Sequence, residues 1–215
     1  MNFPTRPGVF TASLTPLNPD SSPDLNQLVT HVKWLLGQGS DGVALLGSTG
    51  EANSLTMEQR LAIIEHAPKE LPPEKLMLGT GSCSIQDAIR LTRASLKAGV
   101  FTVLVLPPFY YRPQSEEGAF RYFSQLIDTV SEERLRIIFY NFPQLTGFSF
   151  SIELLMRLRE RYGAVVAGIK DSSGDWDNMK MLAREMPDFS VYAGTEKFLL
   201  DILREGGAGC ITATG

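Results

Sequence analysis

The chain has 215 residues, of which 43% are hydrophobic and 20% are charged, and its formal net charge is −4 at pH 7. This composition is typical of a soluble globular enzyme and offers no basic surface for nucleic acid. No hydrophobic run reaches the ~20 residues of a membrane span, and residues 1–5 do not resemble a signal peptide, so we expect a cytoplasmic protein without a membrane segment.

Short hydrophobic runs and amphipathic segments alternate along the chain. The runs are rich in β-branched residues and bounded by turn formers, which is typical of strands buried on both faces. We predict strands over 9–14, 42–46, 75–79, 101–106, 135–140, 164–169, 189–193 and 209–213. Helical periodicity predicts helices over 24–37, 56–67, 85–98, 115–130, 151–162, 176–185 and 197–205.

Strict alternation of strand and helix predicts a parallel α/β fold, and eight such units close naturally into a (β/α)₈ TIM barrel. We take residues 1–215 as one domain. An open doubly wound sheet would need a Gly-x-Gly-x-x-Gly turn after the first strand, whereas this strand leads into Thr15-Pro16-Leu17. The sequence stops at Gly215, directly after the eighth predicted strand, so the barrel apparently lacks its eighth helix. We therefore expect a fragment of a longer polypeptide, with the outer faces of the first and last strands left uncovered.

Lys170 directly follows the hydrophobic run 164–169 and precedes the polar stretch 171–175. An ammonium group at the end of a buried strand is costly unless something uses it. Desolvation favours the neutral amine, which can attack a carbonyl carbon and form an imine. The alternative is a lysine that extends into solvent or pairs with Asp171.

Two other predicted strands carry polar groups at their carboxyl ends. One ends in Tyr140, and another leads into Gly47-Ser48-Thr49-Gly50-Glu51. Glycines at 47 and 50 permit a tight turn whose N–H groups, with the hydroxyls of Ser48 and Thr49, can hold a carboxylate, although the same pattern also serves as a simple helix cap. Because active sites of barrels lie at the carboxyl ends of the strands, Thr49, Tyr140 and Lys170 are expected to converge.

These groups suit imine chemistry, which needs no metal or organic cofactor. A protonated imine is an electron sink for carbon–carbon cleavage, and a phenol such as that of Tyr140 can carry the protons that each step moves. Cys83 and Cys210 lack a metal-type spacing and are expected to be reduced, and His31 and His66 lie in helical patterns. We therefore expect no metal site.

Four motifs in order resemble the dihydrodipicolinate synthase/N-acetylneuraminate lyase family of class I aldolases over essentially the whole chain. The resemblance implies that Lys170 forms a Schiff base with pyruvate or another 2-oxo acid, that Tyr140 shuttles protons, and that Ser48, Thr49 and the adjoining amides hold the carboxylate. It also implies a hydroxyl relay from Thr49 and Tyr140 to Tyr110 of a neighbouring subunit, hence a homo-oligomer (tetramer or dimer), with Tyr111 a close rival. The family adds a C-terminal helical segment. The motifs are Gly47-Ser48-Thr49-Gly50-Glu51, Pro108-Phe109-Tyr110-Tyr111-Arg112-Pro113, Tyr140-Asn141-Phe142-Pro143 and Gly168-Ile169-Lys170-Asp171.

Departures from the best-known members bear on the second substrate, an aldehyde. The synthases have an arginine where this chain has Leu145, and leucine cannot bind the carboxylate of aspartate semialdehyde. Gly194-Thr195-Glu196-Lys197 only partly matches the polyol-binding residues of the sialic-acid lyases. A lyase for a 2-keto-3-deoxy sugar acid fits best, the alternatives being dihydrodipicolinate synthase and N-acetylneuraminate lyase. A barrel that kept the fold without catalysis is the remaining, non-enzymatic alternative.

Three acidic residues near these motifs are interpreted without a catalytic role. Glu51 is expected to be a structural carboxylate at a helix start. Asp171 and Asp175 could contact substrate hydroxyls, but acidic side chains in loops are usually solvated, and we expect the solvated state for both.

Overall fold

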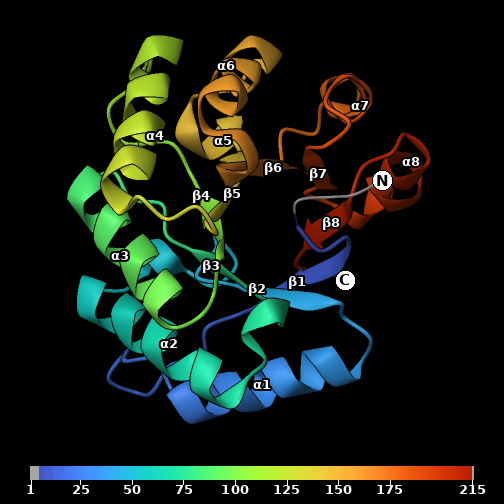
Figure 1. Cartoon of the computed structure of the whole chain (residues 1–215). Coiled ribbons are helices and arrows are strands. Elements are labelled where there is room, and N and C mark those ends of the chain that lie inside the picture. The colour runs from blue at the N-terminus through green and yellow to red at the C-terminus, as the bar shows by residue number, and fades with distance from the viewer. Residues whose placement is uncertain (1–4, 215) are drawn as a thin grey trace.

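The computed structural model describes residues 5–214, and its strands form a closed parallel barrel in chain order, with β1 paired to β8. Figure 1 shows the strands at the centre and the helices around them. This confirms the predicted (β/α)₈ barrel. The strands are β1 Gly8–Ala12, β2 Gly42–Leu45, β3 Leu76–Gly79, β4 Thr102–Val105, β5 Arg136–Asn141, β6 Val166–Asp171, β7 Ser190–Ala193 and β8 Gly209–Thr212.

Each helix of ten residues or more follows a Ser, Thr or Asp whose side chain accepts a hydrogen bond from a backbone N–H of the first turn. These caps fix where the helices begin at the carboxyl-end face of the barrel. The helices are α1 Leu25–Gly37, α2 Met57–Glu70, α3 Ile85–Lys97, α4 Glu116–Val130, α5 Pro143–Thr146, α6 Ile152–Tyr162, α7 Trp176–Glu185 and α8 Leu199–Arg204. Short 3₁₀ helices are η1 Ala52–Ser54, η2 Pro73–Lys75, η3 Gly163–Val165 and η4 Glu196–Phe198.

Most predicted boundaries shift by one or two residues, and three differences bear on the site. Strand β6 continues through Lys170 to Asp171, because Lys170 pairs with residues on both neighbouring strands. Helix α2 continues through Pro68 to Glu70, since a proline in the last turn removes only one helical hydrogen bond. The one-turn helix α5 was not predicted; it ends at Gly147, whose φ of 67° suits a helix end.

The core has two layers, one between strands and helices and one inside the barrel. The inner layer includes Phe10, Met77, Leu104, Ile138 and Tyr192, all buried. A barrel filled in this way is a solid scaffold, and its ligand site must lie at one end of the strands.

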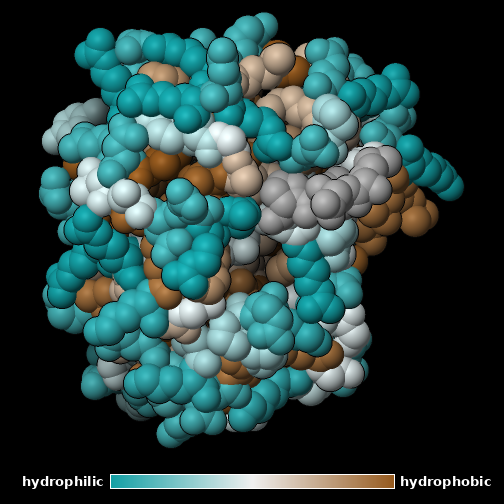
Figure 2. All heavy atoms as spheres, viewed as in Figure 1, coloured by the Kyte–Doolittle hydropathy of each residue, from teal (hydrophilic) through white to brown (hydrophobic). Residues whose placement is uncertain are grey.

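The outer faces of the first and last strands are better covered than the sequence suggested. The prediction of an uncovered strip is wrong for Thr11, which is 4% exposed, and for Cys210, which is fully buried. Both side chains are short, and α8 packs against β7 and β8. The exposed hydrophobic residues of α8 are instead Leu200 and Leu203, and Figure 2 shows a hydrophobic patch there on an otherwise largely hydrophilic rim.

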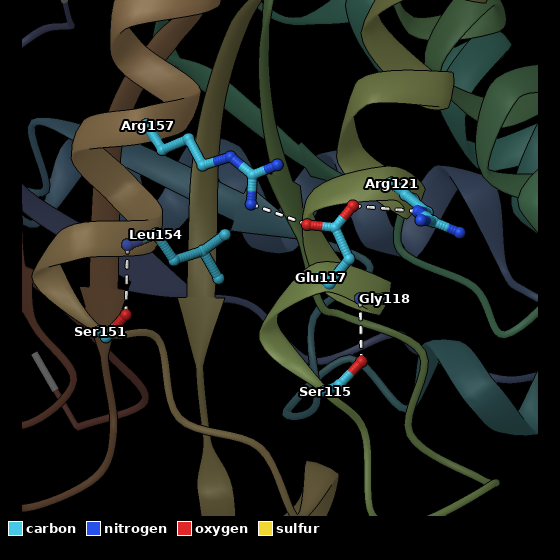
Figure 3. Close-up of polar contacts among 7 residues, drawn as sticks. All are labelled: Ser115, Glu117, Gly118, Arg121, Ser151, Leu154 and Arg157. Carbon is cyan, nitrogen blue, oxygen red and sulfur yellow. Dashed lines mark hydrogen bonds and ion pairs between the residues drawn. The ribbon is translucent and has the colours of Figure 1, made fainter.

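Helices α4 and α6 are joined at the surface by an ion-pair cluster. Glu117 binds Arg157 of α6 at 2.7 Å and Arg121 of its own helix at 3.0 Å (Figure 3). The Arg157 guanidinium also lies 3.6 Å from the ring centroid of Phe120. In the same view, Ser115 and Ser151 cap the two helices through the N–H groups of Gly118 and Leu154.

Candidate active site

Lys170 and Tyr140 occupy paired positions on the adjacent strands β6 and β5. The Nζ of Lys170 donates a hydrogen bond to the Oη of Tyr140 at 3.3 Å and lies 4.4 Å from the centroid of its ring. Lys170 is 6% exposed and Tyr140 is 4% exposed. The lysine therefore does not extend into solvent, and in the described chain it forms no ion pair with Asp171.

A register shift between β5 and β6 creates this pairing. Ile137 is opposite Val166, but Ile138 is opposite Gly168, so β6 holds one extra residue, Ala167. Without the shift, Tyr140 would lie opposite Ile169. Because successive residues of a strand face opposite sides, the bulge is what places the amine and the phenol together on the inner side of the barrel.

The residues that follow Tyr140 and Lys170 form a buried polar network that the sequence interpretation missed. Asp171 is 1% exposed, and its Oδ2 accepts hydrogen bonds from Asn141 Nδ2 at 3.0 Å and from Asn178 Nδ2 at 2.9 Å. Its Oδ1 accepts from the Ser173 N–H at 2.8 Å. The expectation of a solvated Asp171 is therefore wrong, since these donors replace water. The signal was available: two polar residues, Asn141 and Asp171, directly follow the two candidate residues on adjacent strands.

Asp175 behaves as expected of a surface carboxylate. It is exposed, and its Oδ1 accepts from the N–H of Asn178 at the start of α7. Two aspartates four positions apart thus have different structural roles: Asp171 joins β5, β6 and α7, and Asp175 caps a helix.

The turn after β2 carries Ser48 and Thr49 to the same end of the barrel. Tyr140 Oη donates to Ser48 Oγ at 3.5 Å. Thr49 makes no side-chain hydrogen bond within residues 5–214, so Ser48 is the hydroxyl that directly contacts Tyr140. The backbone N–H groups of Ser48 and Thr49 likewise have no protein acceptor among the described residues, which leaves both available for a carboxylate.

The conformation of this turn differs from the prediction. The left-handed residues are Leu46, with φ of 58°, and Glu51, with φ of 50°, while Gly47 and Gly50 are not among the positive-φ residues. Gly50 is needed for space instead, because a Cβ there would lie 3.0 Å from the carbonyl oxygen of Ser13. Non-glycine residues in this region are strained, and such strain tends to persist at functional sites. Glu51 is exposed and precedes η1, in keeping with a structural role at a helix start.

An open pocket of about 290 Å³ brings these groups together. Its size suits a small organic acid. The polar residues that line the pocket include Ser48, Thr49, Tyr140, Lys170, Thr195 and Thr212.

No helix of the described chain is long and hydrophobic enough to cross a membrane. No group of three or more His, Cys, Asp or Glu in residues 5–214 is arranged to bind a metal ion.

The rim of the pocket near β7 and β8 carries a fixed carboxylate. Glu196 Oε2 accepts from Thr212 Oγ1 at 2.8 Å. Side-chain hydrogen bonding with Thr214, the backbone N–H of Glu196 and the bond from Thr212 together lower the pKa of Glu196 to about 2. Glu196 is therefore an anion at neutral pH, next to two threonines of the pocket.

Tyr110 and Tyr111 do not reach this pocket within one chain. They are 75% and 84% exposed, and their rings contact each other edge to face at 5.2 Å. Arg112, the next residue, contacts the segment after α5: its Nε donates to the Phe109 carbonyl at 3.0 Å, and a Cβ added at Gly147 would lie 2.6 Å from its Cδ. Leu145 is 48% exposed near the same rim.

Comparison with known proteins matches residues 5–215 to the dihydrodipicolinate synthetase family. The chain belongs to this family. It is 35% identical over 214 residues to the 4-hydroxy-tetrahydrodipicolinate synthase of Bacillus subtilis, covering 99% of this chain and 71% of the relative. The family membership predicted from the four motifs is thereby confirmed.

Solved structures of the dihydrodipicolinate synthetase family share the barrel. Escherichia coli K12 YagE, solved in complex with pyruvate, has a TM-score of 0.89 at 29% identity, over 97% of this chain and 70% of YagE. The 2-keto-3-deoxygluconate aldolase of Picrophilus torridus has a TM-score of 0.87 at 27% identity, over 97% of this chain and 74% of that enzyme. These likenesses also confirm the predicted class of enzyme, a class I aldolase or lyase.

Proposed function

We propose that Lys170 forms a Schiff base with the ketone of a 2-oxo acid, pyruvate being the imine-bound component, and that the enzyme makes or cleaves the adjoining carbon–carbon bond. The observation that carries this proposal is the buried Lys170 amine held 3.3 Å from the Tyr140 hydroxyl in a pocket that also contains Ser48 and Thr49. A buried amine beside a proton carrier and an anion-binding turn is the set of groups that imine formation requires.

Each group has one task in this mechanism. The amine adds to the ketone carbon, and water leaves after the Tyr140 hydroxyl has returned a proton to the departing oxygen. The protonated imine then accepts the electron pair of the breaking bond while the C4 hydroxyl gives up its proton, which releases the aldehyde and leaves an enamine. Protonation of the enamine carbon and hydrolysis of the imine by water release pyruvate and the free Lys170 amine. The N–H groups and hydroxyls of Ser48 and Thr49 hold the carboxylate, so that the ketone carbon faces Lys170.

We propose a 2-keto-3-deoxy sugar acid as the substrate class. Leu145 offers no charge to a second carboxylate, whereas Thr195, Thr212 and the anionic Glu196 offer acceptors and donors to a hydroxylated chain. The 2-keto-3-deoxygluconate aldolase among the related structures acts on a compound of this kind.

Dihydrodipicolinate synthesis is the second candidate, and Arg112 is the observation that favours it. Its side chain lies against Gly147, two residues from Leu145, at the rim where the synthases place an arginine. Arg112 could supply the cation that Leu145 does not. N-acetylneuraminate lyase activity is the remaining alternative, and only Thr195 and Glu196 support it.

We further propose a homo-oligomer, a tetramer or a dimer, in which Tyr110 enters the pocket of a neighbouring subunit. Tyr110 is exposed and is not among the residues that line the pocket of its own chain, and a neighbouring subunit would bring a hydroxyl of this loop near Thr49 and Tyr140. Tyr111 is the rival for this position. Cytoplasmic location remains our prediction.

Borohydride trapping tests the Schiff base. Hydride reduces the imine to a stable secondary amine, so incubation with pyruvate should add the reduced three-carbon adduct to Lys170, seen by mass spectrometry of the peptide. The Lys170→Ala variant should fold and show neither adduct nor turnover, while Lys97→Ala, at an exposed position of α3, should behave like the wild type. A folded wild-type protein without the adduct would overturn the proposal.

Side-by-side assays test the substrate. An aspartate semialdehyde carboxylate left unpaired in the pocket should cost about 2 to 5 kcal/mol, or about 30- to several-thousand-fold in kcat/KM. We expect poor condensation of pyruvate with aspartate semialdehyde and better cleavage of 2-keto-3-deoxygluconate. Efficient condensation that Arg112→Met abolishes would instead establish the second candidate.

A further inference from the structure

Arg60 of α2 is a buried cation without a carboxylate partner. It is 6% exposed, and no acidic side chain lies within 4.0 Å of it in residues 5–214. One terminal nitrogen, Nη2, donates to the carbonyl oxygens of Gly79 at 3.3 Å and Gly81 at 3.0 Å. The Nε atom is buried and finds no hydrogen-bond partner in the part of the chain that the structure describes. Buried charges are normally paired, so this arrangement needs a reason.

The guanidinium lies behind the wall of the reaction pocket. A small, partly open cavity of about 20 Å³ is lined by residues that include Arg60, Gly47, Ser48 and Tyr140. Ser48 and Tyr140 also line the pocket that contains Lys170. The small cavity has room for about one water molecule and not for a substrate, so Arg60 can influence a substrate only through this shared wall.

Arg60 also supports the turn that carries Ser48 and Thr49. Through Gly79 it holds the end of β3, and this end packs directly on the turn: a Cβ at Gly79 would lie 1.9 Å from the carbonyl oxygen of Leu46. Leu46 has the strained left-handed backbone noted above. Because these contacts are so close, Arg60, the end of β3 and the turn after β2 cannot move independently of one another.

The anion expected at the Ser48–Thr49 turn, on the far side of the wall from Arg60, is the carboxylate of the substrate. We propose that Arg60 is a positioning residue that stabilises the carboxylate of the bound 2-oxo acid from behind the Ser48–Thr49 turn, by its charge and by fixing that turn. This inference rests on the proposed function. Because Arg60 is buried, its attraction for a carboxylate is weakly screened, and we expect it to contribute about tenfold or more in affinity. The carboxylate of Asp87, whose charge acts on Arg60, opposes this effect.

The test compares a charged ligand with a neutral analogue of the same shape. Pyruvate and pyruvamide differ in the carboxylate, and their binding can be followed by ligand NMR in the Lys170→Ala background, where no imine forms. Arg60→Gln should weaken pyruvate binding by about 10- to 100-fold and change pyruvamide binding by less than about 3-fold. Arg60→Lys keeps the charge and should recover most of the pyruvate affinity. Arg121→Gln, at an exposed position of α4, is the control and should change neither.

A second variant should change the affinity for pyruvate in the opposite direction to Arg60→Gln, and it leaves the hydrogen bonds of Arg60 in place. Asp87→Asn removes the opposing charge and should tighten pyruvate binding by about 2-fold, with pyruvamide unchanged. Equal weakening of both ligands by Arg60→Gln, or unchanged pyruvate affinity in Arg60→Gln and Asp87→Asn, would overturn the electrostatic role. Because the assay uses no imine, it gives an answer even if borohydride trapping fails, so the two proposals can fail separately.

Discussion

The two sides of the pocket mouth are built in different ways. The β5–β6 side holds Tyr140 and Lys170 in register, with Asn141 and Asp171 hydrogen-bonded behind them, and all four are buried. The loop after β4 presents Tyr110 and its neighbours to solvent, with no hydrogen bond from either tyrosine hydroxyl in the described chain. The buried side is complete within one chain, because each of its polar groups finds a partner there. On the exposed side, we expect the positions of Tyr110 and Tyr111 to depend on the molecule that packs against this loop.

The largest effect should come from the phenol of the buried side. Tyr140→Phe keeps the ring and deletes the hydroxyl, so kcat should fall by about 10²-fold or more while pyruvate affinity stays within a few-fold. Thr49→Ala should weaken pyruvate binding as well as turnover, because its hydroxyl belongs to the anion-binding turn. Single-turnover and steady-state kinetics measure both. Wild-type turnover in Tyr140→Phe would place proton transfer on another group.

Stability should distinguish the two aspartates that follow Lys170. Asp171→Ala leaves the side-chain N–H groups of Asn141 and Asn178 without an acceptor, so the free energy of unfolding should fall by about 2 to 4 kcal/mol. Asp175→Ala loses only a helix cap, at about 1 kcal/mol. Urea unfolding measures both. Equal losses would show that the buried network adds nothing beyond a cap.

On the exposed side, the tyrosines should affect activity without affecting the stability of the single chain. Tyr110→Phe and Tyr111→Phe should each change the free energy of unfolding by less than about 0.5 kcal/mol, because both side chains are exposed. Tyr110→Phe should lower kcat by about 10-fold, and Tyr111→Phe should leave it within about 2-fold. The reverse ranking would assign the relay to Tyr111.

The smallest effect is expected far from the mouth, at the α4–α6 ion pair of Figure 3. Hydrogen bonds from Arg157 and Arg121 hold the pKa of Glu117 below its usual 4.5. A lowered pKa in the folded state means that the contribution to stability is present above pH ~4.5 and fades as the pH falls further. Glu117→Gln should lower the melting temperature by ~2 °C or less at pH 7 and leave it unchanged near pH 3. Thermal melts at both pH values check this.

Much of the fold and part of the candidate site could be predicted from the sequence. Alternating short hydrophobic runs and helical periods reflect local physics, because a strand buried on both faces and an amphipathic helix leave period-specific patterns. Polar residues at the ends of such runs, above all Lys170, Tyr140 and Ser48, therefore predicted where the pocket would lie. The barrel itself followed from eight repeats of one unit.

Other features depended on contacts between distant segments. The bulge at Ala167 sets Tyr140 opposite Lys170, yet nothing in the run 164–169 marks it, because register is decided by pairing with another strand. Arg60 resembles any surface arginine of a helix until β3 and the turn after β2 enclose it. The sequence alone was sufficient to predict the barrel, the approximate ends of its strands and the position of Lys170 at one of them. Tertiary structure alone decided which polar groups are buried, paired and aligned, because burial and register belong to contacts between segments far apart in the chain.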